Sequence, residues 1–508
     1  MKPSVPSVNL LAPPANSILP SPAAPVPLPE DERREFGDVN ATRAAIFNRV
    51  LEAANQVQPV SNQRHTLRLS GVDYIDPEQF SYADQKAAIL GGRTLGRRMR
   101  GTWELVDNTT GGVLDKRTQV LATVPYLTHR GTYIHEGNEY TLRNQQRLRP
   151  GVFTRVQENG EIEAHANILP GKGVSHRYYL DPEKNVFYLR IQQAKLPLMP
   201  LVKAMGATPK QLREAWGPDL YAANYAKDEA AALKKLKERL LKKEDQDSDE
   251  ETSRERLVRR FAEMELDPEV TTRTLKKGYN GLTLDAVLAI SKKLLAVSRG
   301  EDEVDDRDAL PYQQFLGPED LFAERIARDA GQLRRQLLWK ASRAGNLSKM
   351  PSSALKPQIE AALLGSGLGQ ALEEINPAEI YDKLYSISRL GEGGIPSIDA
   401  VPDEARNVQP SHMAYIDPLR TPESFRVGVD LFLSRAARKG RDGKIYTPLR
   451  DAKTGSTDWY SPQDVADKIV VTPNVFRKYA GFKRVPAMVR GKLDWVKKKD
   501  VDLVAFLL

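Results

Sequence analysis

The chain has 508 residues, of which 28% are charged and 40% hydrophobic, and its formal net charge is +8. This length allows about three domains of ~150 residues, and the balance of residue types is ordinary for a soluble globular protein. The absence of cysteine excludes disulfides and cysteine-ligated zinc, and the six scattered histidines do not suggest a metal cluster. No apolar run approaches the ~18 residues that would cross a bilayer, and the first 30 residues do not resemble a signal peptide, so we expect no membrane partner and a reducing cytoplasm.

Residues 1–35 form a proline-rich segment that we expect to be an extended tail. Proline removes a backbone donor and favours the polyproline II conformation. Leu10, Leu11, Ile18 and Leu19 could anchor the tail on a partner, and a mobile tail is the equal alternative.

The next elements alternate between a helix and hairpins. Apolar spacing predicts a helix over residues 42–58, and residues 103–106 and 118–121 flank a turn rich in Asp, Asn and Gly. A second hairpin is predicted for residues 132–142, around Glu136-Gly137-Asn138. Further strands are expected near residues 152–153, 161–162 and 186–189.

The middle of the chain favours helices. Residues 226–264 are rich in strong helix formers and are interrupted by an acidic run at 244–251, which we expect to be a solvated loop. A helix over 285–297 has Thr283 as its candidate N-cap, and helices should dominate from 318 to 372. Ser461 followed by Pro462 predicts one more helix start.

Four groups of charged residues or glycines invite a functional interpretation. Arg93, Arg97, Arg98 and Arg100 could touch DNA, although such a run is more often a solvated face. Asp305, Asp306 and Asp308 could suggest a metal, but no glycine-centred Ca²⁺ loop is present and a structural role is preferred. The glycines of residues 365–369 follow a helical pattern, which argues against a dinucleotide loop. Arg147 and Arg149, at the end of a predicted hairpin, could face phosphates.

Four blocks, in order, resemble multisubunit RNA polymerase β subunits. The most informative is Arg406-Asn407-Val408-Gln409-Pro410-Ser411-His412, followed by Ile416-Asp417-Pro418-Leu419-Arg420-Thr421-Pro422-Glu423 and Val427-Gly428, which is similar to the family's fork signature. The other three lie within residues 124–153, 303–310 and 365–394. The resemblance covers about residues 100–508.

The resemblance implies an α+β, multidomain fold with the protrusion, lobe and fork architecture of a β subunit, in which mixed β-sheets accompany a helical lobe. The expected segments are a tail at 1–35, the first part of the protrusion at 36–150, the lobe at 151–345, the protrusion return and hybrid-facing segment at 346–395, the fork at 396–430, and the start of the external domain at 431–508.

In the β-subunit family, the segment that corresponds to residues 365–394 lines the RNA–DNA hybrid and forms the rifamycin pocket. Lys383, Tyr385 and Ser386 depart from the family pattern there, so we expect rifamycin resistance, which inhibition of the assembled enzyme at ordinary micromolar drug would contradict. In the fork, Arg426 replaces an asparagine near nucleic acid, and a surface salt bridge is its alternative role. The residues expected to face nucleic acid are Arg147, Arg149, Glu373, Lys383, Tyr385, Ser388, Arg389, Arg406, Glu423 and Arg426.

By the same resemblance, the chain is the N-terminal part of a split β subunit and a non-catalytic part of a DNA-directed RNA polymerase, a nucleotidyltransferase, and it is inactive alone. No catalytic or metal-binding residue is expected in it, because the Mg²⁺-binding aspartates belong to a β′-like partner. Expected partners are a β C-terminal-like fragment, β′-like fragments, the DNA template, the RNA transcript and, as a further option, a promoter-specificity subunit.

Split, trimmed β subunits are a feature of giant bacteriophage polymerases, so a phage origin is the first hypothesis and a cellular or organellar split subunit the second. The expected location is the host bacterial cytoplasm or a phage nucleus-like compartment, with packaging in the virion left open. Two other functions stay open: a β-mimicking protein that inhibits or modifies a host polymerase, and a virion structural protein with a vestigial fold.

Overall fold

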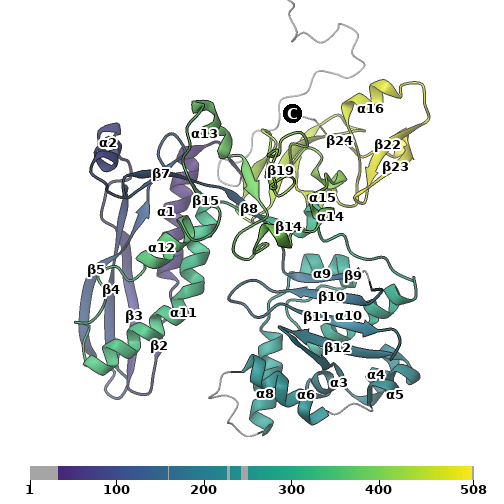
Figure 1. Cartoon of the computed structure of the whole chain (residues 1–508), viewed down its shortest axis with the longest axis horizontal. Helices are drawn as coiled ribbons and strands as arrows, with labels where there is room; N and C mark the ends of the chain where they lie inside the picture. Colours follow the sequence, from purple (N-terminus) through teal and green to yellow (C-terminus); the bar gives the residue numbers. More distant parts are fainter. Residues whose placement is uncertain (1–32, 158, 226–228, 242–249, 506–508) are drawn as a thin grey trace, which may run out of the picture.

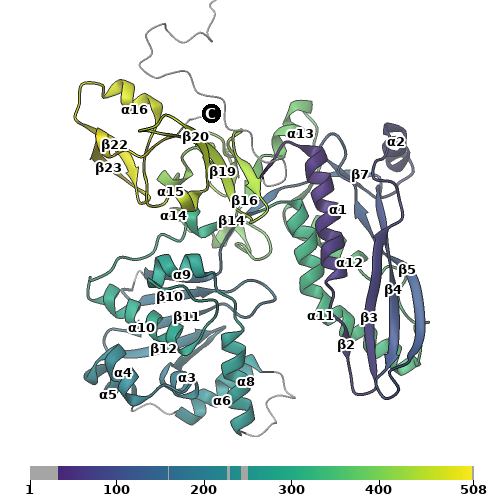
Figure 2. The same cartoon turned by 180° about the vertical axis from the view of Figure 1, so that it is seen from behind.

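The computed structural model describes residues 33–157, 159–225, 229–241 and 250–505. These residues form three bodies around large, separate hydrophobic cores, with several sheets and many helices (Figures 1 and 2). The predicted α+β multidomain fold is therefore confirmed. Most of the predicted tail, residues 1–32, lies outside the described residues, whereas Arg33–Glu35 form a strand that pairs with Arg438–Gly440.

The first body combines an antiparallel meander with helices. Its elements are α1 (Val39–Asn55), β2 (Val60–Ser61), β3 (His65–Tyr74), α2 (Tyr82–Leu90), β4 (Gly96–Asp107), β5 (Val113–Pro125), β6 (Tyr133–His135), β7 (Asn138–Leu142), α11 (Pro318–Ala344), α12 (Lys356–Leu363) and β15 (Gly369–Ala371). Met99, Trp103 and Leu105 alternate inward along β4, as a half-buried strand requires. Both predicted hairpins are confirmed, as β4 with β5 and β6 with β7.

The second body is a five-stranded antiparallel meander covered by helices. Its elements are β9 (Gly151–Val156), β10 (Ile162–Asn167), β11 (His176–Asp181), β12 (Val186–Ile191), β13 (Ala194–Pro197), α3 (Met199–Ala204), α4 (Pro209–Trp216), α5 (Pro218–Tyr225), α6 (Glu229–Leu240), α8 (Glu250–Ala262), α9 (Pro268–Leu275) and α10 (Leu284–Ser298). The Thr283 side chain accepts from the Ala286 amide, which confirms the predicted cap of α10. Residues 244–249 of the predicted acidic loop lie outside the described residues.

The third body contains two sheets and most of the short elements. They are β1 (Arg33–Glu35), β8 (Asn144–Leu148), η1 (Leu310–Tyr312), β14 (Gln313–Leu316), α13 (Pro377–Lys383), β16 (Ser386–Ser388), η2 (Ile398–Ala400), α14 (Asp403–Arg406), η3 (Pro410–His412), β17 (Asp430–Phe432), β18 (Arg438–Gly440), β19 (Ile445–Asp451), β20 (Thr457–Tyr460), α15 (Pro462–Val465), β21 (Ile469–Val471), α16 (Pro473–Lys478), β22 (Arg484–Val489), β23 (Lys492–Lys497), η4 (Lys498–Asp500) and β24 (Leu503–Ala505).

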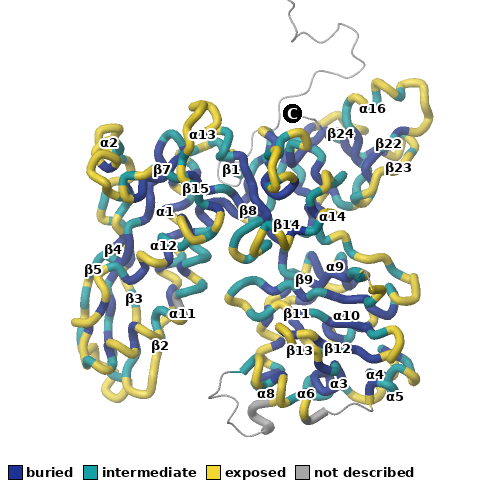
Figure 3. Tube along the Cα trace, in the orientation of Figure 1, coloured by how far each residue is buried: buried dark blue, intermediate teal, exposed yellow. Residues whose placement is uncertain are grey.

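The two sheets of the third body differ in how far apart in the sequence their strands lie. The smaller has the order β14-β8-β16-β17 and so joins strands far apart in the sequence; the larger has the order β1-β18-β19-β24-β21-β22-β23, with β20 beside β19. Figure 3 shows mostly buried residues along β8 and mostly exposed residues along the outer strand β23. The sheet built on β8 therefore forms the centre of the molecule.

The cores place one long helix differently from the sequence-based segments. Residues 318–344 were expected within the 151–345 segment, but Phe322, Ile326 and Leu337 of α11 join the core that contains Ile46 and Val50 of α1. The apolar stripe of α11 needs a partner, and α1 supplies it. The second body's core ends instead with Leu295.

Buried charges join the first and third bodies. Glu319, at the start of α11, pairs with Arg34 at 2.6 Å and with Lys439 at 2.9 Å, and Lys439 also reaches Asp320 at 2.6 Å. Burial opposes the charge of Glu319, but Lys439 and Arg34 outweigh it and lower the pKa of this carboxyl to about 2. Among the described residues, no helix combines the length and apolarity needed to span a bilayer.

Candidate nucleic-acid interface

Residues 403–430, from α14 to the first residue of β17, form a segment that we call the fork loop. Its end is fixed by the buried carboxylate of Asp430, which accepts hydrogen bonds from Arg143, from Arg426 at 3.1 Å and from the Ser388 hydroxyl at 2.6 Å. Thr421 donates to the Asp430 carbonyl at 3.0 Å. One acidic side chain therefore ties the fork loop to β16 and to the segment that precedes β8.

Arg406 shapes the same loop through backbone carbonyls. Its guanidinium donates to the carbonyls of Phe425 at 2.9 Å, Val427 at 3.0 Å and Ile398 at 3.3 Å. Gly428 has φ +69°, and a Cβ there would overlap the Arg406 carbonyl oxygen. Glycine is the residue that this close approach permits.

Arg389 lies inside the molecule beneath the fork loop. It donates to the Ala405 carbonyl and lies 3.6 Å from the Asp308 carboxylate. Burial lowers the pKa of Arg389, and Asp308 counteracts that effect. Burial and the nearby Arg389 together lower the pKa of His412 to about 3, so this imidazole is neutral at physiological pH.

α13 carries a second set of contacts to the fork region. Asp382 pairs with both Arg420 and Arg435, and Arg420 also lies over the Phe432 ring at 4.2 Å. Tyr385 is buried, and its hydroxyl donates to Glu35 at 2.9 Å. Lys383 is half-buried and lies 3.5 Å from Glu379. The rifamycin resistance expected from Lys383, Tyr385 and Ser386 stays a prediction.

Arg147 and Arg149 are placed in the interior and not on an open surface. Arg147 pairs with Glu324 at 2.8 Å, and Arg149 pairs with Asp267 at 2.6 Å and Glu269 at 2.7 Å. Both residues are at least nine-tenths buried. Both guanidinium groups are thus turned toward carboxylates of the chain itself, so the geometry gives no support to the expected phosphate contacts.

The remaining expected site residues fall into two groups. Ser388 and Arg389 are buried, whereas Glu373 and Glu423 are exposed and Arg406 and Arg426 are partly exposed. Large apolar side chains are exposed in the same region: Ile375 and Leu419 at 90%, Phe425 at 70% and Val408 at 64%. Among these residues the most exposed side chains are apolar or acidic, whereas the guanidinium groups of Arg406 and Arg426 bond to groups of the chain itself.

The aspartate run expected to be structural makes internal contacts. Asp305 accepts from the amide and hydroxyl of Thr154 at 2.8 and 2.7 Å and pairs with Lys293 at 2.9 Å. Asp306 accepts from the Gln409 side chain at 3.3 Å. These contacts tie the run to β9, α10 and the fork loop.

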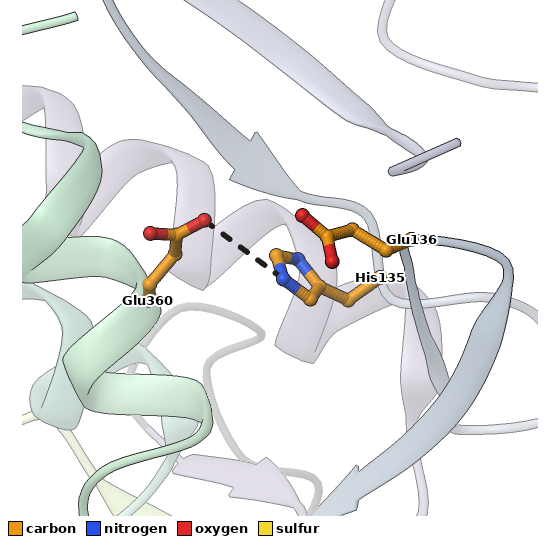
Figure 4. Close-up of side chains that lie close together, drawn as sticks. All are labelled: His135, Glu136 and Glu360. Atoms are coloured by element: carbon orange, nitrogen blue, oxygen red, sulfur yellow. Dashed lines mark ion pairs between the residues drawn. The ribbon is translucent and has the colours of Figure 1, made fainter. Parts of the chain in front are cut away.

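A different group carries the only metal-like spacing found in the described part of the chain. His135, Glu136 and Glu360 offer ligand atoms within 4.8 Å of one another, and Figure 4 shows Glu360 facing the His135 ring across 3.8 Å. The sequence had not suggested any histidine-based cluster. Lys356 lies 3.2 Å from the Glu360 carboxylate and already supplies a positive charge there.

The arginines at 93–100 are partly engaged. Arg98 pairs with Asp76 at 2.7 Å, and Arg97 lies over the Tyr74 ring at 4.4 Å. Arg93 and Arg100 are exposed.

Residues 477–500, which we call the basic hairpin, were not singled out from the sequence. They comprise the end of α16, β22, β23 and η4. The signal was visible as the run Lys497-Lys498-Lys499, but the segment was interpreted only through its place in the external domain.

The fork loop lies within a segment that is similar to a known protein family. The family described as RNA polymerase Rpb2, domain 3, matches residues 370–438, which span β15 to β18 and contain the fork loop. Residues 370–438 are thus similar to that domain, and the mixed α+β multidomain fold agrees with a β-like protein.

Full-length relatives extend the similarity beyond this segment. The chain is 24% identical over 456 residues to the DNA-directed RNA polymerase subunit beta of Prochlorococcus marinus (strain MIT 9301), covering 84% of this chain and 41% of the relative. It is 23% identical over 490 residues to the same subunit of Nostoc sp. (strain PCC 7120), covering 90% and 43%. The chain spans about two fifths of the length of the curated relatives it matches. Together these matches support an RNA polymerase β-like protein.

Proposed function

We propose that the chain is an N-terminal β-like subunit of a multisubunit DNA-dependent RNA polymerase. It helps to hold the DNA and the RNA–DNA hybrid in the main channel, and partner chains supply catalysis. The observation that carries the proposal is the coincidence of the matched segment, 370–438, with a loop braced by Asp430. A rigid, internally braced loop is suited to positioning nucleic acid by shape.

The exposed apolar side chains of this segment support assembly with other subunits. Ile375, Leu419 and Phe425 each expose a large apolar side chain, and exposed apolar area is favourable at an interface with another chain. The partners in the proposal are the remaining β-like segments, β′-like chains that bind Mg²⁺, and the DNA template and RNA transcript; a promoter-specificity subunit is a further option. No cofactor is assigned to this chain. A phage origin and a split subunit remain parts of the proposal.

The test is affinity purification of the chain from its native source, with mass spectrometry of the recovered proteins and a transcription assay of the eluate. Recovery of β-like and β′-like chains with RNA synthesis is the expected result. Recovery of an intact host polymerase whose synthesis is suppressed would favour the β-mimicking inhibitor instead. A virion structural role predicts recovery with capsid proteins and no RNA synthesis.

A further inference from the structure

The basic hairpin holds almost all of the net charge of the protein. Its 24 residues include nine cationic and two acidic side chains, a net of +7, against +8 for the whole chain. The cationic residues are Arg477, Lys478, Lys483, Arg484, Arg490, Lys492, Lys497, Lys498 and Lys499. The other 484 residues are thus almost electrically balanced, and the field of the protein is concentrated at one place.

Carboxylates of the described residues leave this charge nearly uncompensated. Lys492 pairs with Glu303 at 2.7 Å, but both side chains are more than 70% exposed, so the pair is weak. Arg484 donates to the Trp495 carbonyl at 2.5 Å and Lys498 to the Ala480 carbonyl at 2.8 Å. Bonds to neutral carbonyls orient these cations without removing their charge.

Aromatic rings lie among the cations. Phe482 is 62% exposed and Trp495 47% exposed, and both pack edge-on against Tyr479, with ring centroids 5.6 and 5.4 Å away. The rings therefore support one another in a fixed arrangement while presenting open surface. An exposed ring held in place can stack with little loss of conformational freedom.

The strand register puts one ring and two cations on the same face of the hairpin. Arg484 lies opposite Lys497, and Pro486 lies opposite Trp495, so Arg484, Trp495 and Lys497 share a side of the hairpin. Like charges directly opposite each other destabilise a sheet. A bound polyanion would relieve this repulsion.

Protection of an exposed sheet edge does not by itself explain the surface of the basic hairpin. β23 is the outermost strand of its sheet and is exposed along most of its length, and lysines on such a strand discourage edge-to-edge aggregation. That role would be opposed by Trp495, Leu493 and Phe482, which expose apolar area at the same place. Figures 1 and 2 place β22, β23 and α16 at the outer corner of the third body, on the side away from the first body.

We propose that the basic hairpin is a second nucleic-acid-binding surface, which takes single-stranded RNA or DNA without sequence preference. Lysine and arginine side chains would contact phosphates, and Phe482 and Trp495 would stack on bases. The surface is separate from the fork loop and does not require the partner subunits. Its binding should therefore be measurable on the isolated full-length chain.

The experiment measures fluorescence anisotropy with labelled oligothymidylate and oligouridylate of about 20 nucleotides, and with a duplex of equal length, across about 50–200 mM salt. The variant Lys497→Glu/Lys499→Glu should weaken single-strand binding about tenfold or more and flatten its salt dependence. The matched control Lys234→Glu/Lys235→Glu makes the same charge change at exposed lysines of α6 and should leave affinity unchanged.

Ring variants test the stacking contribution. Phe482→Ala and Trp495→Ala should each weaken single-strand binding about tenfold, whereas Trp339→Ala, at a similarly exposed tryptophan of α11, should not. Phe482 lies in the turn before β22, so its variant keeps the test valid if loss of Trp495 perturbs the hairpin. Equal affinities for oligothymidylate and oligouridylate would show that both strands are ligands, and a difference would identify the preferred one.

Three results would overturn the proposal. They are no binding at low salt, affinities unaffected by both the lysine and the ring variants, and tighter binding of the duplex with no effect of the ring variants. The last result would make the surface a general polyanion contact. Circular dichroism of each variant confirms that the fold is kept.

Discussion

Cationic side chains have different roles in the fork loop and in the basic hairpin. Arg406 and Arg426 of the fork loop, and Arg389 beneath it, direct donors at carbonyls and carboxylates of the chain itself. Lys497, Lys499 and Arg490 of the hairpin are exposed. The contrast shows that cations near the fork loop fix the shape of the chain, whereas these cations of the basic hairpin leave their charge open to solvent.

The largest expected difference between the two regions comes from replacing one aspartate in each by alanine. Asp430→Ala should cost about 3 kcal/mol of unfolding free energy, because it leaves Arg143, Arg426 and the buried Ser388 hydroxyl without their acceptor. Asp494→Ala, at an exposed position of β23, should change stability by less than about 0.5 kcal/mol. Urea unfolding of both variants measures the difference, and equal losses would contradict an Asp430-centred loop.

Acidic pH should affect the fold and spare the hairpin. Burial lowers the pKa of His165 and His176 to about 4 and that of His412, also beside Arg389, to about 3. Between pH 6.5 and those values the unfolded chain binds protons that the folded chain does not, so stability falls as pH falls, by about 1.4 kcal/mol per unit for each histidine.

Urea unfolding at pH 7 and pH 5 tests the sign, and His412→Gln should remove its share of the slope. The hairpin contains no histidine, so oligonucleotide affinity of the folded chain should not change between these pH values. A stability that rises on acidification would exclude buried neutral histidines.

One glycine in each region allows the backbone packing of the fork loop and of the basic hairpin to be compared. Gly428→Ala should cost about 2 kcal/mol, because the position combines φ +69° with overlap against the Arg406 carbonyl. Gly491→Ala, in the turn between β22 and β23, has φ +77° but open space around it, so about 1 kcal/mol is expected. Thermal unfolding compares the two, and a larger effect at Gly491 would contradict the close packing of the fork loop.

The smallest expected effects concern two ion pairs that differ in burial. Arg420→Ala breaks the Arg420–Asp382 pair, in which the aspartate is mostly buried, and should cost about 1 kcal/mol. Lys492→Ala breaks the pair with Glu303, and its cost should be near zero because both partners are exposed. If urea unfolding gives the reverse order, the anchoring role of α13 is wrong.

Local patterns predicted much of the fold. The β4–β5 hairpin follows from alternating apolar residues around a glycine turn, and the caps at Thr283 and Ser461 follow from side chains that reach amides three residues on. The resemblance carried by the ordered blocks agrees with the family match over residues 370–438.

Long-range pairing could not be predicted in the same way. Arg147 and Arg149 were expected to face phosphates, yet their partners Glu324, Asp267 and Glu269 lie far along the sequence. Whether an arginine is occupied depends on carboxylates that only the folded chain brings near. The basic hairpin is the converse case. Its lysine run is visible in the sequence, whereas the packing of Trp495 against Tyr479 depends on the strand pairing of the folded chain.

The central claim is that this chain is a working part of an RNA polymerase. The most direct test is to purify the complex, reconstitute it from its separated chains, and measure RNA synthesis with and without this one. We expect synthesis only when the chain is present, and a clear loss when Asp430→Ala replaces it. Undiminished synthesis by the other chains alone would contradict the account.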